Sequence, residues 1–150
     1  MRCRDTEETR TFYEDFLGLP LVHAIKITET KTARITNTLH SFYRISDGSH
    51  IAFFESPDNP FAFKRQHDFD LHTALEVEED FMHAMIKKAK LLGIEIRGIS
   101  DHDFIHSVYF RDPNGYVLEL TVKQENHDES LDPTKNHARQ ILSDWQDNKL

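Results

Sequence analysis

The chain has few of the residues that build covalent cross-links, and it has no long apolar run. Among its 150 residues Cys3 is the one cysteine, so neither an internal disulfide nor a cysteine-based zinc site can form. No apolar run approaches the roughly 20 residues of a membrane-spanning helix, and no basic segment followed by an apolar one marks a secretion signal. These absences lead us to expect a soluble, cytoplasmic protein that does not enter membranes.

Basic residues are also scarce relative to acidic ones. The 18 lysines and arginines face 26 aspartates and glutamates, which gives a net charge of −8. Such a charge opposes a general affinity for nucleic acids or anionic membranes. The length is sufficient for one domain with a single core. We therefore expect one domain over residues 1–150, with a small molecule as its partner and no nucleic acid.

A β-hairpin is the clearest pattern that the sequence does contain. Residues 108–110 read as a short strand, residues 112–115 (Asp-Pro-Asn-Gly) as a tight turn, and residues 116–122 as a second strand. Strand alternation places Glu119 on the face opposite the leucines of its strand. A half-buried carboxylate requires a cation, a metal or hydrogen-bond donors. Glu119 is thus either a candidate ligand or a solvent-facing residue on an edge strand.

The whole chain reads as two similar halves. For the first half we expect a helix from Asp5 to about Leu17 and strands at residues 19–30, 39–46 and 49–55. For the second half we expect a strand at residues 71–77, a helix at 78–92 with its core face at Phe81, Met85, Ala89 and Leu92, a strand at 94–99, and the hairpin. Gly18 and Gly93 end the two helices, and each half closes with a Gly-containing turn and a strand.

This repeat predicts an α+β fold of two paired βαβββ modules that form a cup-shaped mixed sheet. The modules cover about residues 1–56 and 70–123, and the strand before the first helix is reduced to residues 1–4. A C-terminal helix is expected at about residues 132–147, beginning at Asp132. We expect its apolar stripe to pack on its own domain, with a second subunit of a homodimer as the alternative; the stripe consists of Ala138, Ile141, Leu142 and Trp145.

Two residues are candidate metal ligands because each interrupts an apolar strand: His72 and Glu119. Imidazole and carboxylate together hold iron(II), manganese or zinc in many proteins, but a facial triad needs a third protein ligand. The repeat places the equivalent of His72 before Met1. Three explanations stay open: the third ligand is missing, the start of the chain has been lost, or another histidine such as His23 or His50 substitutes for it.

These features resemble the vicinal oxygen chelate superfamily, which contains glyoxalase I, bleomycin and fosfomycin resistance proteins and extradiol ring-cleaving dioxygenases. The resemblance extends from Met1 to about Lys123, with residues 9–18 similar to the first helix and residues 109–119 similar to the most specific motif. The closing pattern resembles that of the extradiol branch: His102, five residues, Val108-Tyr109, two residues, Asp112-Pro113-Asn114-Gly115, three residues, Glu119.

The resemblance implies a metal-dependent oxidoreductase that cleaves a small aromatic diol. It implies that His72 and Glu119 bind a divalent metal, Fe(II) or Mn(II), and that His102 and Tyr109 act as catalytic residues on the substrate or oxygen. The four-ligand glyoxalase arrangement is disfavoured, because its first-module carboxylate aligns near Phe53. Two alternatives are a non-catalytic binding protein of the bleomycin-resistance kind and a lyase or isomerase on the same scaffold.

Overall fold

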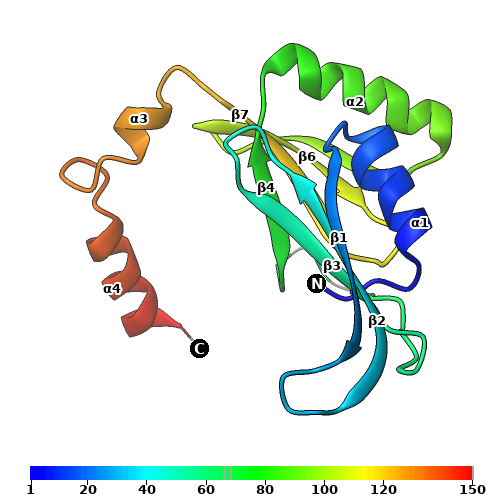
Figure 1. Ribbon diagram of the computed structural model, residues 1–150. Coiled ribbons are helices and arrows are strands. Elements are labelled where there is room, and N and C mark those ends of the chain that lie inside the picture. The colour runs from blue at the N-terminus through cyan, green and yellow to red at the C-terminus, as the bar shows by residue number, and fades with distance from the viewer. Residues whose placement is uncertain (66, 68, 150) are drawn as a thin grey trace.

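The computed structural model describes residues 1–65, 67 and 69–149 as two modules followed by a helical tail (Figure 1). Module 1 contains α1 (Thr6–Arg10), its π-helical continuation η1 (Thr11–Phe16), β1 (Leu21–Glu29), β2 (Ile35–Arg44) and β3 (His50–Glu55). Module 2 contains β4 (His72–Glu76), α2 (Glu79–Leu92), β5 (Ile96–Asp101), β6 (Ile105–Arg111) and β7 (Val117–Lys123). The tail contains α3 (His127–Ser130) and α4 (Ala138–Asn148).

Each module builds its own sheet, and the two sheets follow one plan. The order is β1-β2-β3 in module 1 and β4-β7-β6-β5 in module 2. In module 2, β4 runs parallel to β7, whereas the other pairs are antiparallel. In module 1, Arg2 forms a parallel bridge with Phe54 of β3, so the first residues occupy the place that β4 holds in module 2. The α+β fold of two βαβββ modules is thereby confirmed.

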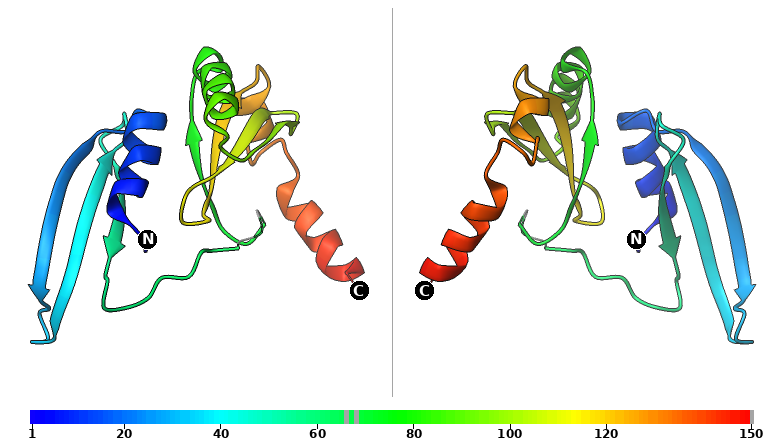
Figure 2. Two further views of the ribbon diagram at one scale, coloured as in Figure 1. Left: turned by 90° about the vertical axis from the view of Figure 1, so that its right-hand side faces the viewer. Right: turned by 90° about the vertical axis from the view of Figure 1, so that its left-hand side faces the viewer.

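The modules meet through their helices. Figure 2 shows α1 and α2 on the sides of the two sheets that face each other. Phe16 of η1 packs edge-on against Phe110 of β6, with ring centroids 5.5 Å apart, and the Lys88 Nζ of α2 donates to the Phe16 carbonyl oxygen at 2.8 Å. One core therefore serves both modules, and the opposite face of each sheet points outward.

The first helix begins where the sequence indicates. Asp5 is its N-cap and accepts a hydrogen bond from the Glu8 backbone N–H at 2.8 Å. Glu8 does not close the reciprocal capping box, because its carboxylate pairs with Arg4 instead. The chain leaves the helix at Gly18, whose φ of +78° lies in the left-handed region that glycine adopts without strain.

The buried face of α2 differs from the predicted one. Met82, Met85 and Ala89 are buried, whereas Phe81 and Leu92 are 37% and 60% exposed. Neighbouring residues on a helix are about 100° apart, so the face that packs on β5, β7 and η1 is centred one position away from Phe81. The prediction that Phe81 and Leu92 belong to the core was wrong.

The tail also departs from the prediction. No continuous helix starts at Asp132; its carboxylate accepts hydrogen bonds from the Thr134 backbone N–H and hydroxyl and closes a turn. His137, with a left-handed φ of 52°, then precedes α4. The predicted stripe on α4 is exposed rather than packed on its own chain, with Ile141 64%, Leu142 59% and Trp145 65% exposed.

Among the residues placed in the structure, no helix is long and apolar enough to cross a membrane.

Candidate functional site

His72 and Glu119 lie side by side on the outward face of the module 2 sheet. His72 begins β4, and Glu119 lies in the middle of the parallel neighbour β7. Their side chains meet, with 2.9 Å between the His72 Nε2 and the Glu119 Oε2. The Glu119 side chain is only 6% exposed, whereas that of His72 is 36% exposed. A buried carboxylate and an imidazole therefore point at one place that opens to solvent on the histidine side.

The other two predicted site residues join them on this face, which we call the site face. Tyr109 of β6 is the direct cross-strand partner of Glu119. His102 follows β5, and its Nε2 lies 3.2 Å from the Tyr109 hydroxyl. The His72 and Tyr109 rings meet edge to face, with centroids 6.1 Å apart. The structure thus brings together all four residues that the sequence singled out.

The surroundings of Tyr109 keep its phenol protonated. Burial raises the pKa of Tyr109, and the negative charge of Glu119 and a hydrogen bond to that carboxylate raise it further. A phenol carries one hydrogen. When that hydrogen is donated to Glu119, the bond between His102 and Tyr109 requires the His102 Nε2 to be the donor. A series of hydrogen bonds then runs from His102 through the Tyr109 phenol to Glu119.

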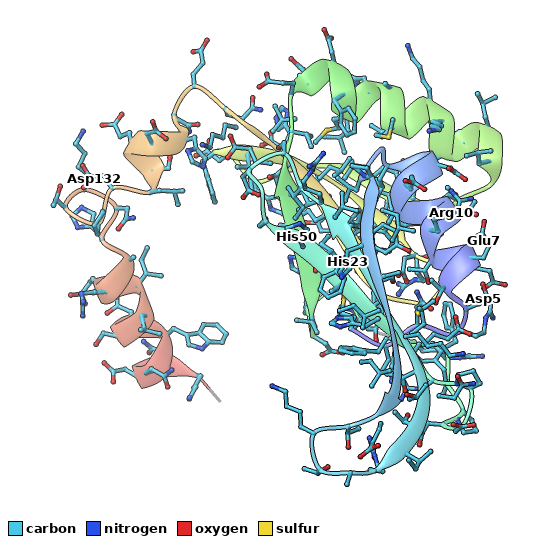
Figure 3. All side chains as sticks on the ribbon, viewed as in Figure 1. Asp5, Glu7, Arg10, His23, His50 and Asp132 are labelled. Atoms are coloured by element: carbon cyan, nitrogen blue, oxygen red, sulfur yellow. The ribbon has the colours of Figure 1, made fainter. Side chains whose placement is uncertain are left out.

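Two side chains of the site face have the chemistry of metal ligands. The imidazole nitrogen of His72 and the carboxylate of Glu119 are donors that first-row divalent metals accept, and they already converge in the structure. Across residues 1–65, 67 and 69–149, no group of three His, Cys, Asp or Glu side chains is arranged to hold a metal ion. His23 and His50 lie on β1 and β3 of module 1 (Figure 3) and do not complete the set.

The turn of the hairpin stabilises the fold and is not part of the site face. Asp112 is buried and accepts hydrogen bonds from the Tyr13 hydroxyl at 3.2 Å and from the backbone N–H groups of Asn114 and Tyr116. The Asn114 Oδ1 accepts from the Arg4 backbone N–H at 2.8 Å. Two residues of the most recognisable motif therefore join module 2 to the first helix of module 1, away from His72 and Glu119.

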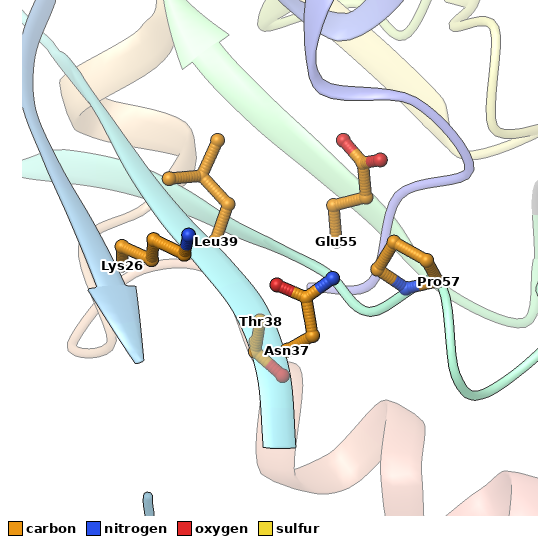
Figure 4. A pocket seen from close by; sticks show the side chains of 6 residues that line it. All are labelled: Lys26, Asn37, Thr38, Leu39, Glu55 and Pro57. Atoms are coloured by element: carbon orange, nitrogen blue, oxygen red, sulfur yellow. The ribbon is translucent and has the colours of Figure 1, made fainter. Parts of the chain in front are cut away.

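A separate cavity of about 260 Å³ opens in module 1 (Figure 4). Its lining includes Lys26 and Glu55, along with Asn37, Thr38, Leu39 and Pro57. Glu55 accepts hydrogen bonds from the backbone N–H and the hydroxyl of Thr6 at 2.7 and 2.5 Å, so it holds the start of α1. This carboxylate has a structural partner and takes no part in the site face.

One residue near the site was not found from the sequence. Arg97 of β5 is the cross-strand partner of Tyr109, and its guanidinium carbon lies 4.4 Å from the centroid of the Tyr109 ring. Its positive charge lowers the pKa of Tyr109 and partly opposes the effects of burial and of Glu119. The available signal was weak, because a single arginine on an alternating strand reads as a solvent-facing residue.

Solved structures with a similar fold come from several sources. The fosfomycin resistance protein FosX from Listeria monocytogenes, solved with Mn(II) and sulfate, has a TM-score of 0.62 and 18% identity, covering 86% of this chain and 92% of FosX. A glyoxylase/bleomycin resistance protein/dioxygenase domain from Frankia sp. EAN1pec has a TM-score of 0.67 and 16% identity, with 82% and 92% covered. An integron cassette protein from the Halifax Harbour sewage outfall metagenome has a TM-score of 0.57 and 21% identity, with 81% and 92% covered.

These structural likenesses, at low identity, support the fold. No curated protein matches the chain significantly. A family model does match, over residues 1–120, which includes both modules up to the middle of β7. With this match and the paired modules of the structure, the chain belongs to the Glyoxalase/Bleomycin resistance protein/Dioxygenase superfamily.

Proposed function

We propose that the chain is a divalent-metal-dependent enzyme of the extradiol ring-cleaving kind, acting on a small aromatic diol. The observation that carries the proposal is the meeting of His72, Glu119, Tyr109 and His102 on one face of the sheet. The related FosX structure with Mn(II) supports a divalent metal in this superfamily, and Fe(II) is the alternative.

His72 and Glu119 would hold the metal through the Nε2 and the carboxylate, which now face each other at 2.9 Å. When bound, such a metal supplies a Lewis acid and a template for two neighbouring oxygen atoms. Side chains of the protein would then donate hydrogen bonds and transfer protons. Tyr109 stays protonated and donates a hydrogen bond to a negatively charged oxygen, and His102 keeps the phenol oriented and can take or return a proton.

We also infer that the working form is a homodimer. The apolar stripe of α4 is exposed on the single chain, most clearly at Ile141, Leu142 and Trp145. An amphipathic helix gains stability by burying such a stripe, and a second copy of the chain provides a surface for it.

The test of the activity is ring cleavage after anaerobic reconstitution with Fe(II) or Mn(II). The parent chain should cleave a catechol, and Glu119→Gln should reduce the rate by more than about 100-fold, since changes to outer-shell partners alone cost roughly 10- to 100-fold. Glu125→Gln, the same change at an exposed loop position, is the matched control and should cleave like the parent. Undiminished cleavage by Glu119→Gln would remove this residue from the site and overturn the proposal.

Non-catalytic binding of a small molecule is the second candidate. It is favoured by one observation: within the part of the chain that the structure describes, the site face offers two metal ligands and no third. In this case the parent chain would bind an aromatic ligand equally well with and without metal and would show no turnover with either ion. A lyase or isomerase on the same scaffold would instead turn over a substrate without consuming oxygen.

A further inference from the structure

The cavity of module 1 is bordered by two side chains of opposite charge. Lys26, Leu39 and Glu55 are successive cross-strand partners on β1, β2 and β3, so their side chains lie on the same face of the sheet. Neighbouring strands are about 4.8 Å apart, which places the backbones of Lys26 and Glu55 about 10 Å apart with Leu39 between them. All three residues line the cavity of about 260 Å³ (Figure 4). The cavity therefore has a cationic side, an anionic side and an apolar middle.

These two charges do not neutralise each other. The Glu55 Oε2 accepts hydrogen bonds from the backbone N–H and the hydroxyl of Thr6, which fixes this carboxylate at the start of α1. The Glu55 Oε1 has no hydrogen-bond partner among the residues that the structure describes. Within the same described residues, the side chain of Lys26 forms no ion pair and no hydrogen bond. An ammonium group and a carboxylate oxygen that both lack a partner there thus border one cavity.

The rest of the lining is suited to a small, partly apolar molecule. Leu39 and Pro57 provide apolar surface. The side-chain amide of Asn37 makes no hydrogen bond to any residue in the described part of the chain and can donate to a ligand oxygen. The carboxylate of Asp58 accepts from the Asn37 backbone N–H at 3.2 Å and adds negative charge beside the cavity. At about 260 Å³ the cavity is smaller than the roughly 300 to 1,000 Å³ of sites for drug-sized ligands, so its ligand is small.

A ligand of this cavity has to pair with a cation and with an anion at the same time. A purely anionic ligand would pair with Lys26, but Glu55 and the net charge of −8 would repel it. A purely cationic ligand would pair with Glu55, but Lys26 would repel it. A zwitterion carries both charges and no net charge, and each of its ionic hydrogen bonds is stronger than a neutral one. The cavity therefore favours a zwitterion over either ion alone.

We propose that this cavity is a binding site for a free α-amino acid with an apolar side chain. The ammonium group of the amino acid donates to the Glu55 Oε1, and its carboxylate accepts from the Lys26 Nζ and the Asn37 amide. Its side chain contacts Leu39 and Pro57. This binding does not depend on the proposed ring cleavage, which uses residues of module 2.

Three ligands with the same carbon skeleton test the two charges separately. Free leucine carries both charges, 4-methylpentanoate lacks the ammonium group, and 3-methylbutylamine lacks the carboxylate. Isothermal titration calorimetry on the metal-free parent chain should give a dissociation constant for leucine that is roughly 10- to 100-fold lower than for either analogue, the range expected for one charge-assisted hydrogen-bonded pair. Absence of leucine binding, or equal affinity for all three ligands, overturns the proposal.

Substitutions of the two charged residues test whether the cavity is where leucine binds. Lys26→Gln should weaken leucine binding by roughly 10- to 100-fold and should not weaken the binding of 3-methylbutylamine. Lys31→Gln, the same change at an exposed position in the turn after β1, is the matched control and should bind leucine like the parent. Equal leucine affinity of Lys26→Gln and the parent overturns the proposal.

Glu55→Gln tests the anionic side in the opposite direction. It should weaken leucine binding, whereas 4-methylpentanoate should bind at least as tightly as it does to the parent, because the repulsion is removed. Glu55 also holds the start of α1, and a variant that had merely lost its fold would bind neither ligand. In that case Lys26→Gln decides, because the Lys26 side chain has no partner among the described residues whose loss could unfold the chain. Weaker binding of leucine and of 4-methylpentanoate by a folded Glu55→Gln chain contradicts the assigned orientation and overturns the proposal.

Discussion

At the scale of single residues, Asp112 shows how a carboxylate is kept inside the core. It is 2% exposed, and its two oxygens accept hydrogen bonds from Tyr13, Asn114 and Tyr116. Burial raises the pKa of Asp112, and these hydrogen bonds oppose that rise because they favour the charged form. The interaction with the Tyr13 hydroxyl is the one that crosses between the modules.

Replacing Tyr13 by Phe should therefore weaken the fold in a pH-dependent way. A folded pKa above the ordinary value of 3.8 means that stability is greatest below that value and falls as the pH rises through the folded pKa. Loss of the Tyr13 hydroxyl raises the folded pKa of Asp112 further. The deficit of Tyr13→Phe in the free energy of unfolding should then be larger at about pH 7, where we expect about 2 kcal/mol, than at about pH 4.

Urea unfolding at the two pH values measures this deficit. Tyr43→Phe is the matched control, because Tyr43 is also fully buried but its hydroxyl makes no hydrogen bond of normal geometry to any residue that the structure describes. Its free energy of unfolding should follow that of the parent at both pH values. A Tyr13→Phe deficit that is the same at both would show that Asp112 does not respond to this hydroxyl.

The site residues differed in how far the sequence alone revealed them. Glu119 and His72 were found because a charged or ligand-forming side chain interrupts an apolar strand, and the resemblance to the superfamily added His102 and Tyr109. Arg97 was missed, because its importance depends on which residue faces it across β5 and β6, and cross-strand register is not visible in one strand's pattern. The third ligand was not found by either route.

At the scale of elements, the turn between β6 and β7 holds the connection between the modules in place. The Lys64 backbone N–H donates to the Asn114 carbonyl oxygen at 2.8 Å, and an added Cβ on Gly115 would lie 2.1 Å from the Lys64 carbonyl oxygen. Gly115 also has a left-handed φ of +92°. This position therefore requires glycine for two reasons, its backbone conformation and the close approach of the connection.

Gly115→Ala and Gly48→Ala separate those two reasons. Gly48 has a similar φ of +88°, but nothing lies within 4 Å of its added Cβ. Gly48→Ala should cost only the backbone strain, about 1 to 2 kcal/mol. Gly115→Ala should cost roughly 2 kcal/mol more, because the connection must also move. Thermal unfolding gives the two losses, and trypsin should cut after Lys64 faster in Gly115→Ala. Equal losses with equal cleavage rates would show that the contact with Lys64 is unimportant.

The tail helix shows the limit of reading burial from an apolar stripe. The stripe of α4 was predicted correctly as a pattern, but its expected packing on the same chain was wrong, since Trp145 is 65% exposed. Periodicity identifies the apolar face of a helix and does not identify the surface that covers it. The helix also starts later than predicted, at Ala138, because Asp132 closes a local turn.

Trp145 is the one tryptophan in the chain, so its fluorescence reports on α4 alone. In dilute solution its emission should be quenched readily by iodide, and Trp145→Ala should change the free energy of unfolding by less than about 0.5 kcal/mol, as for other exposed positions. As the protein concentration rises and the homodimer forms, quenching should decrease, and Trp145→Ala should sediment as a monomer. Protection from iodide in a monomer at every concentration would contradict the exposed stripe.

At the scale of the whole molecule, the internal repeat was sufficient to predict the two modules, whereas their mutual placement was not predictable. The matching helices, glycines and strands indicated the βαβββ plan, and the parallel bridge from Arg2 to Phe54 fits it. The contacts that join the modules connect residues far apart in sequence, such as Tyr13 and Asp112, which are 99 positions apart. No local sequence pattern predicts such a contact, because each of the two side chains is equally compatible with packing inside its own module.

The separation of the Asp112 turn from the site face also bears on how proteins of this design change over evolutionary time. Replacing Asp112 or Asn114 removes hydrogen bonds between the modules, and a side chain on Gly115 would collide with Lys64 of the connection, so natural selection for a folded protein alone suffices to retain all three. The described contacts of His72 with Glu119 and of Arg97 with Tyr109 lie within module 2 and belong to the site face. A descendant can therefore exchange its chemistry while keeping the motif by which its ancestry is recognised, and that motif records descent more faithfully than it records activity.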